Sequence, residues 1–177
     1  MNAQFAGAER VYLIGYRGAG KSTVGPKLAQ ALGWNFADTD DEIISATGRT
    51  IAQLFTGPGE AAFRDYETAA MQKLSNTPKV VIATGGGIVL REENRVRLAA
   101  SGYPIWLRAP AATLFGRIQA DGGTTHRRPH LIAGGSQQEV ETLLRVREPL
   151  YAAVARLTIE TDKQSPDEVV SRILASC

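Results

Sequence analysis

The chain alternates between short runs of apolar residues and longer stretches in which apolar residues return every three or four positions. Short continuous runs are typical of parallel strands covered on both faces, whereas the longer spacing is typical of helices with one buried side. We expect strands at residues 11–14, 35–38, 80–83, 104–107 and 157–161. We expect helices at about 21–32, 40–47, 60–75, 91–101, 110–120, 137–155 and 166–175.

Strands that alternate with helices predict an α/β fold, in which helices cover both faces of an open sheet and make a three-layer sandwich. In such folds, ligands bind at the carboxyl ends of the strands. Glycines or acidic residues follow three of the predicted strands, after residues 14, 36 and 83. The pattern therefore predicts a binding site at the carboxyl ends of these strands.

Size and composition are those of an ordinary globular protein, with 177 residues, of which 44% are hydrophobic and 21% charged. We interpret residues 1–177 as one domain, with residues 1–9 as a loose tail. The net charge is only +2 and the basic residues are scattered, so nucleic acid is not the expected partner. A few cationic side chains in one cleft would still suit a small anionic substrate.

The remaining composition bears on the cellular compartment. The one cysteine, Cys177, allows no intramolecular disulfide and no metal site built on cysteine. No apolar run approaches the roughly 18 residues of a membrane span. Residues 1–9 carry no basic cluster followed by an apolar stretch, so we see no secretory signal and expect a cytoplasmic protein without membrane contact.

Residues 15–22 read Gly-Tyr-Arg-Gly-Ala-Gly-Lys-Ser, which fits the phosphate-loop pattern G-x-x-x-x-G-K-[ST]. A predicted strand precedes them and a predicted helix follows, which is the context that the motif needs. The glycines let backbone N–H groups approach phosphate oxygens, and the start of the helix adds further donors. Lys21 is expected to reach the β- and γ-phosphates, and Ser22 to hold Mg²⁺. The expected nucleotide contacts are Gly18, Ala19, Gly20, Lys21, Ser22 and Thr23.

Asp38 and Asp40 follow the second predicted strand with one residue between them. Two acids in this position can serve different ligands: one holds Mg²⁺ and the other accepts hydrogen bonds from substrate hydroxyls. The alternative is structural, because Asp40 could simply cap the helix that follows. The neighbouring phosphate loop favours Asp38 as the metal ligand.

Two arginines and a glycine turn are further candidates. Arg64 lies in the predicted helix 60–75, where an arginine is usually solvated or in a surface ion pair. Arg147 falls in phase with an apolar helical stripe, so it calls for a buried or ligand anion unless it reaches the surface. Three glycines, Gly85, Gly86 and Gly87, follow the third strand; they suit either close approach to a ligand or a plain turn.

Residues 120–136 interrupt the alternation of strands and helices. The segment is glycine-rich at both ends and carries Arg128 and Pro129 in its polar, basic middle. Its composition fits a disordered surface loop. It also fits a lid that closes over phosphates, which a phosphotransferase needs in order to exclude water.

Taken together, these residues resemble the shikimate kinase family, and the resemblance covers nearly the whole chain. Six ordered elements matching together are far more specific than any one of them. The six are Gly15–Ser22, Asp38–Asp40, Phe63-Arg64, Gly85–Gly87, Arg128-Pro129 and Arg147 ahead of Pro149-Leu150-Tyr151. The resemblance implies a five-stranded parallel sheet of the nucleoside-monophosphate-kinase type, a mobile lid and a monomeric protein. His130 departs from the family pattern, which usually has leucine there.

The resemblance also implies the two substrates, ATP and shikimate, and the groups that hold them. Arg64 and Arg147 would bind the shikimate carboxylate, Asp40 would accept hydrogen bonds from ring hydroxyls, and the glycine turn would pack against the ring. Asp38 would hold Mg²⁺ together with Ser22.

On the donor side, the resemblance implies that Lys21 and Arg128 neutralise the phosphoryl group during transfer. Arg117 would stack near the adenine, and residues 162–166 would form the other side of the base pocket. The expected reaction makes shikimate 3-phosphate and ADP.

Two other functions fit parts of this pattern. A gluconate or other small-acid kinase could use the same scaffold, but the glycine turn and the paired arginines favour shikimate. A sensor that binds its ligand without catalysis could lack Lys21, Ser22, Asp38 or Arg128, and all four are present.

Overall fold

A computed structural model describes residues 7–121 and 136–176 of the chain. Five strands form one sheet in the order β2-β3-β1-β4-β5, and every neighbouring pair is parallel. The predicted strands and the predicted class are therefore confirmed. The strands are β1 (Arg10–Ile14), β2 (Asn35–Asp38), β3 (Val80–Ala83), β4 (Tyr103–Arg108) and β5 (Leu157–Glu160).

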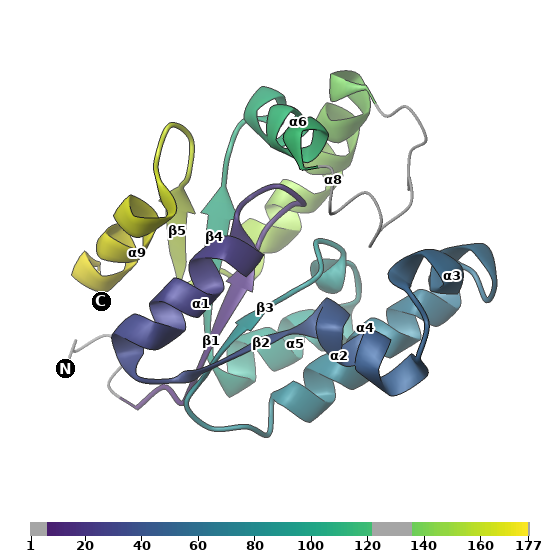
Figure 1. The fold of residues 1–177 in the computed structure, drawn as a ribbon, viewed down its shortest axis with the longest axis horizontal. Helices are drawn as coiled ribbons and strands as arrows, with labels where there is room; N and C mark the ends of the chain where they lie inside the picture. The colour runs from purple at the N-terminus through teal and green to yellow at the C-terminus, as the bar shows by residue number, and fades with distance from the viewer. Residues whose placement is uncertain (1–6, 122–135, 177) are drawn as a thin grey trace.

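Helices connect the strands and cover both faces of the sheet (Figure 1). They are α1 (Lys21–Leu32), α2 (Thr39–Thr47), α3 (Ile51–Thr56), α4 (Glu60–Leu74), α5 (Glu92–Ser101), α6 (Ala111–Ala120), α8 (Gln137–Val154) and α9 (Pro166–Ala175). A short 3₁₀ turn, η2 (Ile88–Leu90), follows the glycine turn. All seven predicted helices are present, with ends that differ by a residue or two.

Two short elements were not predicted, α3 and η2. The helix α3 has only six residues, too few for a clear periodicity. It does have a capping box, in which Thr50 Oγ1 accepts from Gln53 N–H (3.2 Å) and Gln53 Oε1 accepts from Thr50 N–H (2.9 Å). That spacing of threonine and glutamine is the sequence signal for its start.

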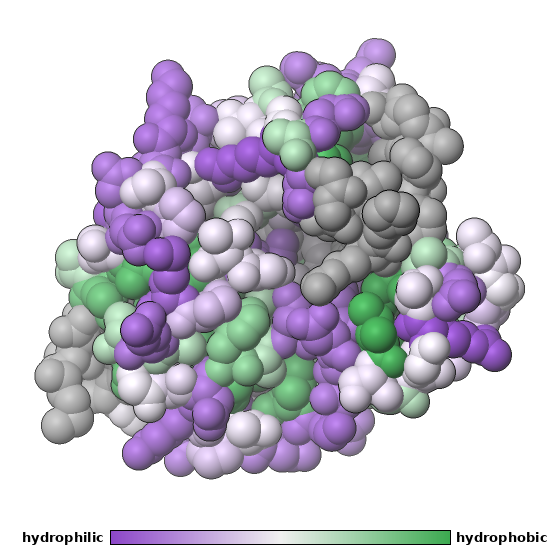
Figure 2. Space-filling model, in the orientation of Figure 1, coloured by the Kyte–Doolittle hydropathy of each residue, from purple (hydrophilic) through white to green (hydrophobic). Residues whose placement is uncertain are grey.

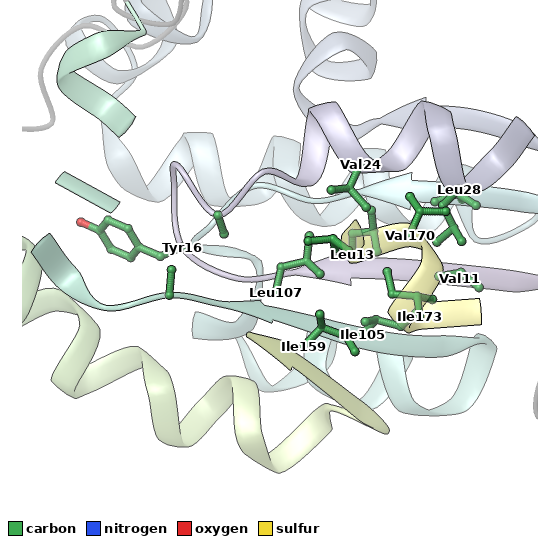
Figure 3. Packing of buried hydrophobic residues seen from close by; sticks show 14 of the residues in the cluster. Val11, Leu13, Tyr16, Val24, Leu28, Ile105, Leu107, Ile159, Val170 and Ile173 are labelled. Atoms are coloured by element: carbon green, nitrogen blue, oxygen red, sulfur yellow. The ribbon is translucent and has the colours of Figure 1, made fainter. Parts of the chain in front are cut away.

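Strand β1 shows why the apolar runs are continuous. Val11 and Leu13 point into one core cluster with Leu28 of α1 and Ile173 of α9, as Figure 3 shows. The alternate residues of β1 point to the opposite face and pack there on side chains from α4, α5 and α8. Both faces of a central strand are thus buried, so every position is apolar.

A third, smaller cluster lies beside the sheet, between α2, α3 and α4. It consists of Ile43, Ile51, Leu54, Phe63 and Ala70. On the outer surface, hydrophobic side chains occur in small separate groups among hydrophilic ones on the face that Figure 2 shows. Within residues 7–121 and 136–176, no helix is both long enough and apolar enough to cross a membrane.

The candidate lid and tail are mostly outside this description. Residues 122–135, which include Arg128, and residues 1–6 lie outside the described residues. The fold nevertheless positions the phosphate loop, the two acids and the glycine turn at the carboxyl ends of β1, β2 and β3, as the α/β pattern requires. The predicted arginines Arg64, Arg117 and Arg147 come from the helices α4, α6 and α8.

Candidate active site

The phosphate loop joins β1 to α1 and has the backbone that only glycine adopts easily. Gly15 has a φ of +138°, and a side chain there would collide with the carbonyl oxygen of Leu107. Gly20, with a φ of +96°, precedes the first residue of α1, which has no side-chain cap in the described structure. The first N–H groups of α1 therefore face the loop, where an anion can accept from them.

Lys21 lies against this loop. Its ammonium group donates to the carbonyl oxygens of Gly15 (2.8 Å) and Tyr16 (2.9 Å), and the residue is 8% exposed. Buried ammonium groups need such acceptors or an anion. The lysine thus holds a positive charge inside the loop, next to where phosphate oxygens would enter.

Asp38 connects the loop to α2. Its Oδ2 accepts from Ser22 Oγ (2.7 Å) and its Oδ1 accepts from the backbone N–H of Asp40 (2.9 Å). Asp38 rather than Asp40 therefore caps α2, which corrects the structural alternative considered for Asp40. Burial, and then the nearby charge of Asp40, raise the pKa of Asp38, while the Ser22 hydrogen bond opposes the rise.

Arg64 is buried, not solvated as arginines on helices usually are (8% exposed). Its Nη2 pairs with Glu60 (2.9 Å) and its Nη1 pairs with Glu67. The guanidinium also lies over the rings of Phe55 and Phe63, 5.9 and 5.5 Å from their centroids. Burial by itself lowers the pKa of Arg64, but the charges and hydrogen bonds of Glu67 and Glu60 have the larger effect, so the pKa is raised.

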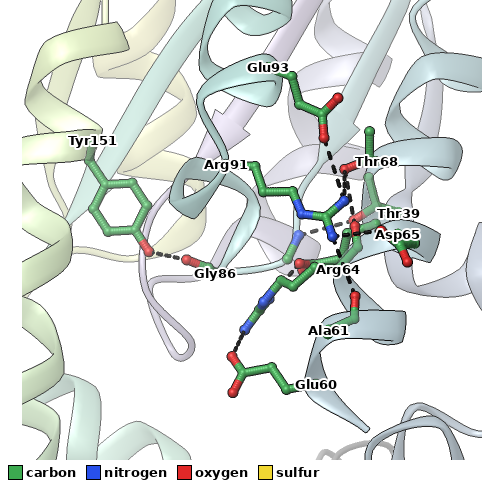
Figure 4. Close-up of polar contacts among 12 residues, drawn as sticks. Thr39, Glu60, Ala61, Arg64, Asp65, Thr68, Gly86, Arg91, Glu93 and Tyr151 are labelled. Atoms are coloured by element: carbon green, nitrogen blue, oxygen red, sulfur yellow. Dashed lines mark hydrogen bonds and ion pairs between the residues drawn. The ribbon is translucent and has the colours of Figure 1, made fainter. Parts of the chain in front are cut away.

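The glycine turn packs against Arg64 on one side and the phosphate loop on the other. A Cβ at Gly87 would lie 2.6 Å from Arg64 Cζ, so only glycine leaves room for the guanidinium. Gly86 lies close to the backbone of Gly15, and its carbonyl oxygen accepts from the Tyr151 hydroxyl of α8, as Figure 4 shows. Gly85 N–H donates to Thr39 Oγ1 (3.0 Å).

Arg147 is half-buried on α8, one turn before Tyr151. Its guanidinium carbon lies 5.4 Å from the centroid of the Tyr16 ring. Its buried Nε has no hydrogen-bond partner within the part of the chain that the structure describes. The pKa of Tyr151 is raised by burial, whereas the charge of Arg147 and its side-chain hydrogen bond with Tyr151 act in the opposite direction.

Arg117 joins α6 to two loops of the site. Its Nη2 donates to the carbonyl oxygen of Thr161 (2.6 Å), and its Nη1 to Thr161 Oγ1 (3.0 Å) and Gly18 O (3.3 Å). Thr113 Oγ1, also on α6, donates to Asp162 Oδ1 (2.7 Å). These bonds hold the segment after β5 beside the phosphate loop.

A cavity of about 380 Å³ lies between these elements. Its lining includes the predicted nucleotide contacts Gly18, Ala19, Gly20, Lys21, Ser22, Thr23 and Arg117, together with Asp38, Asp40 and Gly86. Arg64 and Arg147 do not line it: Arg64 packs against Gly87 and Arg147 lies over the ring of Tyr16. Arg128 is outside the described residues.

Several residues around the cavity were not predicted. Arg17, Thr84 and Thr161 line it, and Glu67 pairs with Arg64 from one turn further along α4. The spacing of Glu67 after Arg64 is the i, i+3 pattern of helical ion pairs, which was a usable signal. The others are polar residues in loops, where spacing carries no information about contacts.

Comparison with known proteins agrees with this geometry. The family model for shikimate kinase matches residues 17–177. A shikimate kinase of Rhodopirellula baltica is 42% identical over 174 residues, which cover 98% of this chain and 93% of that protein. This chain belongs to the shikimate kinase family. Another relative, shikimate kinase 2 of Dickeya chrysanthemi, is 40% identical, with 94% of each chain covered.

Solved structures of the shikimate kinase family share this fold. The shikimate kinase of Acinetobacter baumannii in complex with shikimate has a TM-score of 0.88 and 36% identity, covering 98% of this chain and 94% of that one. The shikimate kinase of Aquifex aeolicus has a TM-score of 0.74 and 33% identity, with 94% of each chain covered. A gluconokinase of Sinorhizobium meliloti (TM-score 0.59, 20% identity) shares the fold alone.

Proposed function

We propose that this protein transfers the γ-phosphoryl group of ATP to the 3-hydroxyl group of shikimate, which gives shikimate 3-phosphate and ADP. The observation that carries the proposal is the cavity, in which a phosphate loop meets two acids and a glycine turn. Arg64, which packs against that turn, and Arg147, which lies over the ring of Tyr16, can supply the charge for an acceptor carboxylate. Membership of the shikimate kinase family supports the same reaction.

ATP would bind with its phosphates on residues 18–23. The backbone N–H groups of the loop and of the start of α1 would donate to phosphate oxygens, and Lys21 would leave its carbonyl partners to reach the β- and γ-phosphates. Arg117 would border the adenine, and residues 162–166 would form the opposite wall. Thr161, which binds Arg117, keeps these two sides at a defined separation.

Mg²⁺ fits the oxygens of Ser22 and Asp38. The two side chains lie 2.7 Å apart, and the half-buried carboxylate has a second acid beside it, so a cation there would relieve an unfavourable charge. Within residues 7–121 and 136–176, no three histidine, cysteine or acidic side chains converge on one point. Phosphate oxygens and water would supply the other ligands, and the ion would neutralise charge on the β- and γ-phosphates.

Shikimate would bind beside the glycine turn, with its ring hydroxyls toward Asp40 in the cavity. Its carboxylate would pair with Arg64 and Arg147, and each charge-assisted hydrogen bond is worth roughly 1.5–3 kcal/mol. Glu60, whose side chain is 61% exposed, would give up Arg64 to the substrate, while Glu67, which is 1% exposed, would keep the guanidinium in place. Asp40 would accept hydrogen bonds from the ring hydroxyls.

No covalent intermediate is needed, because phosphoryl transfer depends chiefly on alignment and charge neutralisation. The 3-hydroxyl oxygen would attack the γ-phosphorus in line with the departing ADP oxygen. Asp40 would orient this hydroxyl, and Lys21 would stabilise the charge on the transferring group. We propose the same stabilising role for Arg128, carried by a lid at residues 120–136 that excludes water.

The test is ADP release with ATP and Mg²⁺ against a panel of acceptors: shikimate, quinate, gluconate, nucleoside monophosphates and water alone. We expect turnover with shikimate and little with the others. Turnover with gluconate or a monophosphate instead would contradict the roles of Arg64, Arg147 and Asp40. A folded protein that binds shikimate and turns over no acceptor would be a sensor.

We also propose that the protein acts as a monomer in the cytoplasm, where ATP is available. Its resemblance to the shikimate kinase family supports this. Light scattering of the purified protein gives the mass in solution, and cell fractionation gives the compartment. The mass of a dimer would contradict the monomer, and recovery outside the cytoplasmic fraction would contradict the compartment.

A further inference from the structure

Arg147 differs from Arg64 in what holds it. Glu60 and Glu67 fix the guanidinium of Arg64, whereas no carboxylate among the described residues pairs with Arg147. A long, charged side chain without an ion pair loses considerable rotamer freedom when a ligand orders it. Tyr151 gives Arg147 one side-chain hydrogen bond. A further group must support the guanidinium if Arg147 is to bind an acceptor without that loss.

The ring of Tyr16 is the group that lies under Arg147. The guanidinium carbon is 5.4 Å from the ring centroid, within the range of a cation–π contact. Tyr16 is only 6% exposed, so little water competes for the face of its ring. Figure 3 shows the ring beyond the strand ends, apart from the aliphatic residues of the same cluster.

Tyr16 is also part of the phosphate loop. Its carbonyl oxygen accepts from Lys21 Nζ (2.9 Å) and from Ala19 N–H (3.2 Å). The backbone of this one residue therefore serves the nucleotide side, and its side chain reaches the acceptor side. A substitution of the side chain leaves the carbonyl group in place, so the two contributions can be measured separately.

We propose that Tyr16 is a positioning residue, whose ring holds the guanidinium of Arg147 ready for the acceptor carboxylate. The inference rests on the proposed function, in which Arg147 binds that carboxylate. Tyr16 itself touches no reacting atom. Its contribution comes from the face of the aromatic ring. A phenylalanine at position 16 should therefore preserve the contact with Arg147, and an aliphatic residue should not.

Kinetics of Tyr16→Leu and Tyr16→Phe test this directly. Loss of a cation–π contact corresponds to a rise of about 2- to 30-fold in the KM for shikimate. We expect that rise in Tyr16→Leu, with kcat and the KM for ATP within about twofold of the unchanged protein. Tyr16→Phe should restore the KM for shikimate. Tyr66→Leu, the same change at a more exposed site on α4, is the control and should change neither constant.

A double-mutant cycle asks whether Tyr16 acts through Arg147. In an Arg147→Ala background, Tyr16→Leu should raise the KM for shikimate by less than twofold, because the partner of the ring is already gone. Full additivity of the two substitutions would overturn the proposal. So would an unchanged KM for shikimate in Tyr16→Leu, an equal loss for ATP and shikimate, or a Tyr16→Phe variant that behaves like Tyr16→Leu.

A spectroscopic signal separates this inference from the proposed function. In protein labelled with ¹⁵N-arginine, the Nε–H resonance of Arg147, assigned with Arg147→Lys, should carry a ring-current shift. The shift should persist in Tyr16→Phe and disappear in Tyr16→Leu, or in Tyr16→Met if the leucine variant does not fold. If the Arg147 resonance has the same chemical shift in all of these variants, the guanidinium does not lie over the Tyr16 ring and the proposal is wrong. Absence of shikimate turnover in the unchanged protein, with the shift present, overturns only the proposed function.

Discussion

Replacing Gly87 with alanine tests whether the absence of a side chain in the glycine turn lets Arg64 reach its position in the acceptor site. The backbone of Gly87 has a φ of −92°, so alanine fits the turn without backbone strain. The new Cβ would lie 2.6 Å from Arg64 Cζ, and ordinary contact begins at 3.4 Å. Its nitrogen Nη1 would lie nearer still, so the guanidinium would have to retreat by more than 0.8 Å (3.4 minus 2.6).

That retreat should affect the acceptor far more than the nucleotide. Loss of one charge-assisted bond to the carboxylate, at roughly 1.5–3 kcal/mol, corresponds to about a 10- to 150-fold rise in the KM for shikimate. The KM for ATP should stay within about twofold, because Arg64 does not line the cavity with the phosphate loop. The free energy of unfolding should fall by about 1–3 kcal/mol from overpacking.

The assay is steady-state ADP release with each substrate varied in turn, together with urea unfolding. Gly116→Ala is the matched control, since Gly116 is exposed in α6 and a Cβ there meets nothing within 4 Å. It should leave both KM values unchanged and add about 0.5–1 kcal/mol to the free energy of unfolding. An unchanged KM for shikimate in Gly87→Ala would refute the link between this glycine and the acceptor site.

Three further predictions concern other parts of the site. Lys21→Met should lower kcat by on the order of 10³ while circular dichroism stays unchanged, because it removes the positive charge that stabilises the transferring phosphoryl group. Turnover like that of the wild-type protein would contradict the phosphate-loop assignment. Asp38→Asn should abolish Mg²⁺-dependent turnover yet raise Tm at neutral pH. Because the folded pKa of Asp38 is raised, the folded state binds the proton more tightly than the unfolded state does, so stability falls as pH rises through the interval between the two pKa values. The gain in Tm should therefore disappear in acid below the ordinary carboxyl pKa, and a gain that persists there would contradict the charge argument. Tyr151→Phe should lower the free energy of unfolding, measured with urea, by about 1–3 kcal/mol, because the buried carbonyl oxygen of Gly86 loses its hydrogen-bond donor. An unchanged free energy of unfolding would show that water replaces the hydroxyl group.

The sequence determined the elements and their order. Continuous apolar runs predict the inner strands β1, β3 and β4 because both faces of each are buried, whereas the edge strands β2 and β5 are only partly buried. The glycines and the lysine of residues 15–22 predict the phosphate loop, because this combination is rarely needed in other loops. These features are local: each depends on residues within one turn or strand. The family resemblance supplied the shikimate assignment, which neither composition nor spacing could have provided.

Tertiary structure decided which residues meet. The order β2-β3-β1-β4-β5 places β3 between β2 and β1, so the glycine turn after β3 lies close to the phosphate loop after β1, and Asp38 at the end of β2 comes close to Ser22. The same packing buries Arg64 against Gly87 and stacks Arg147 on Tyr16. A periodic pattern reports which side of an element is buried. It does not report which distant residue lies there, because that depends on how the elements pack.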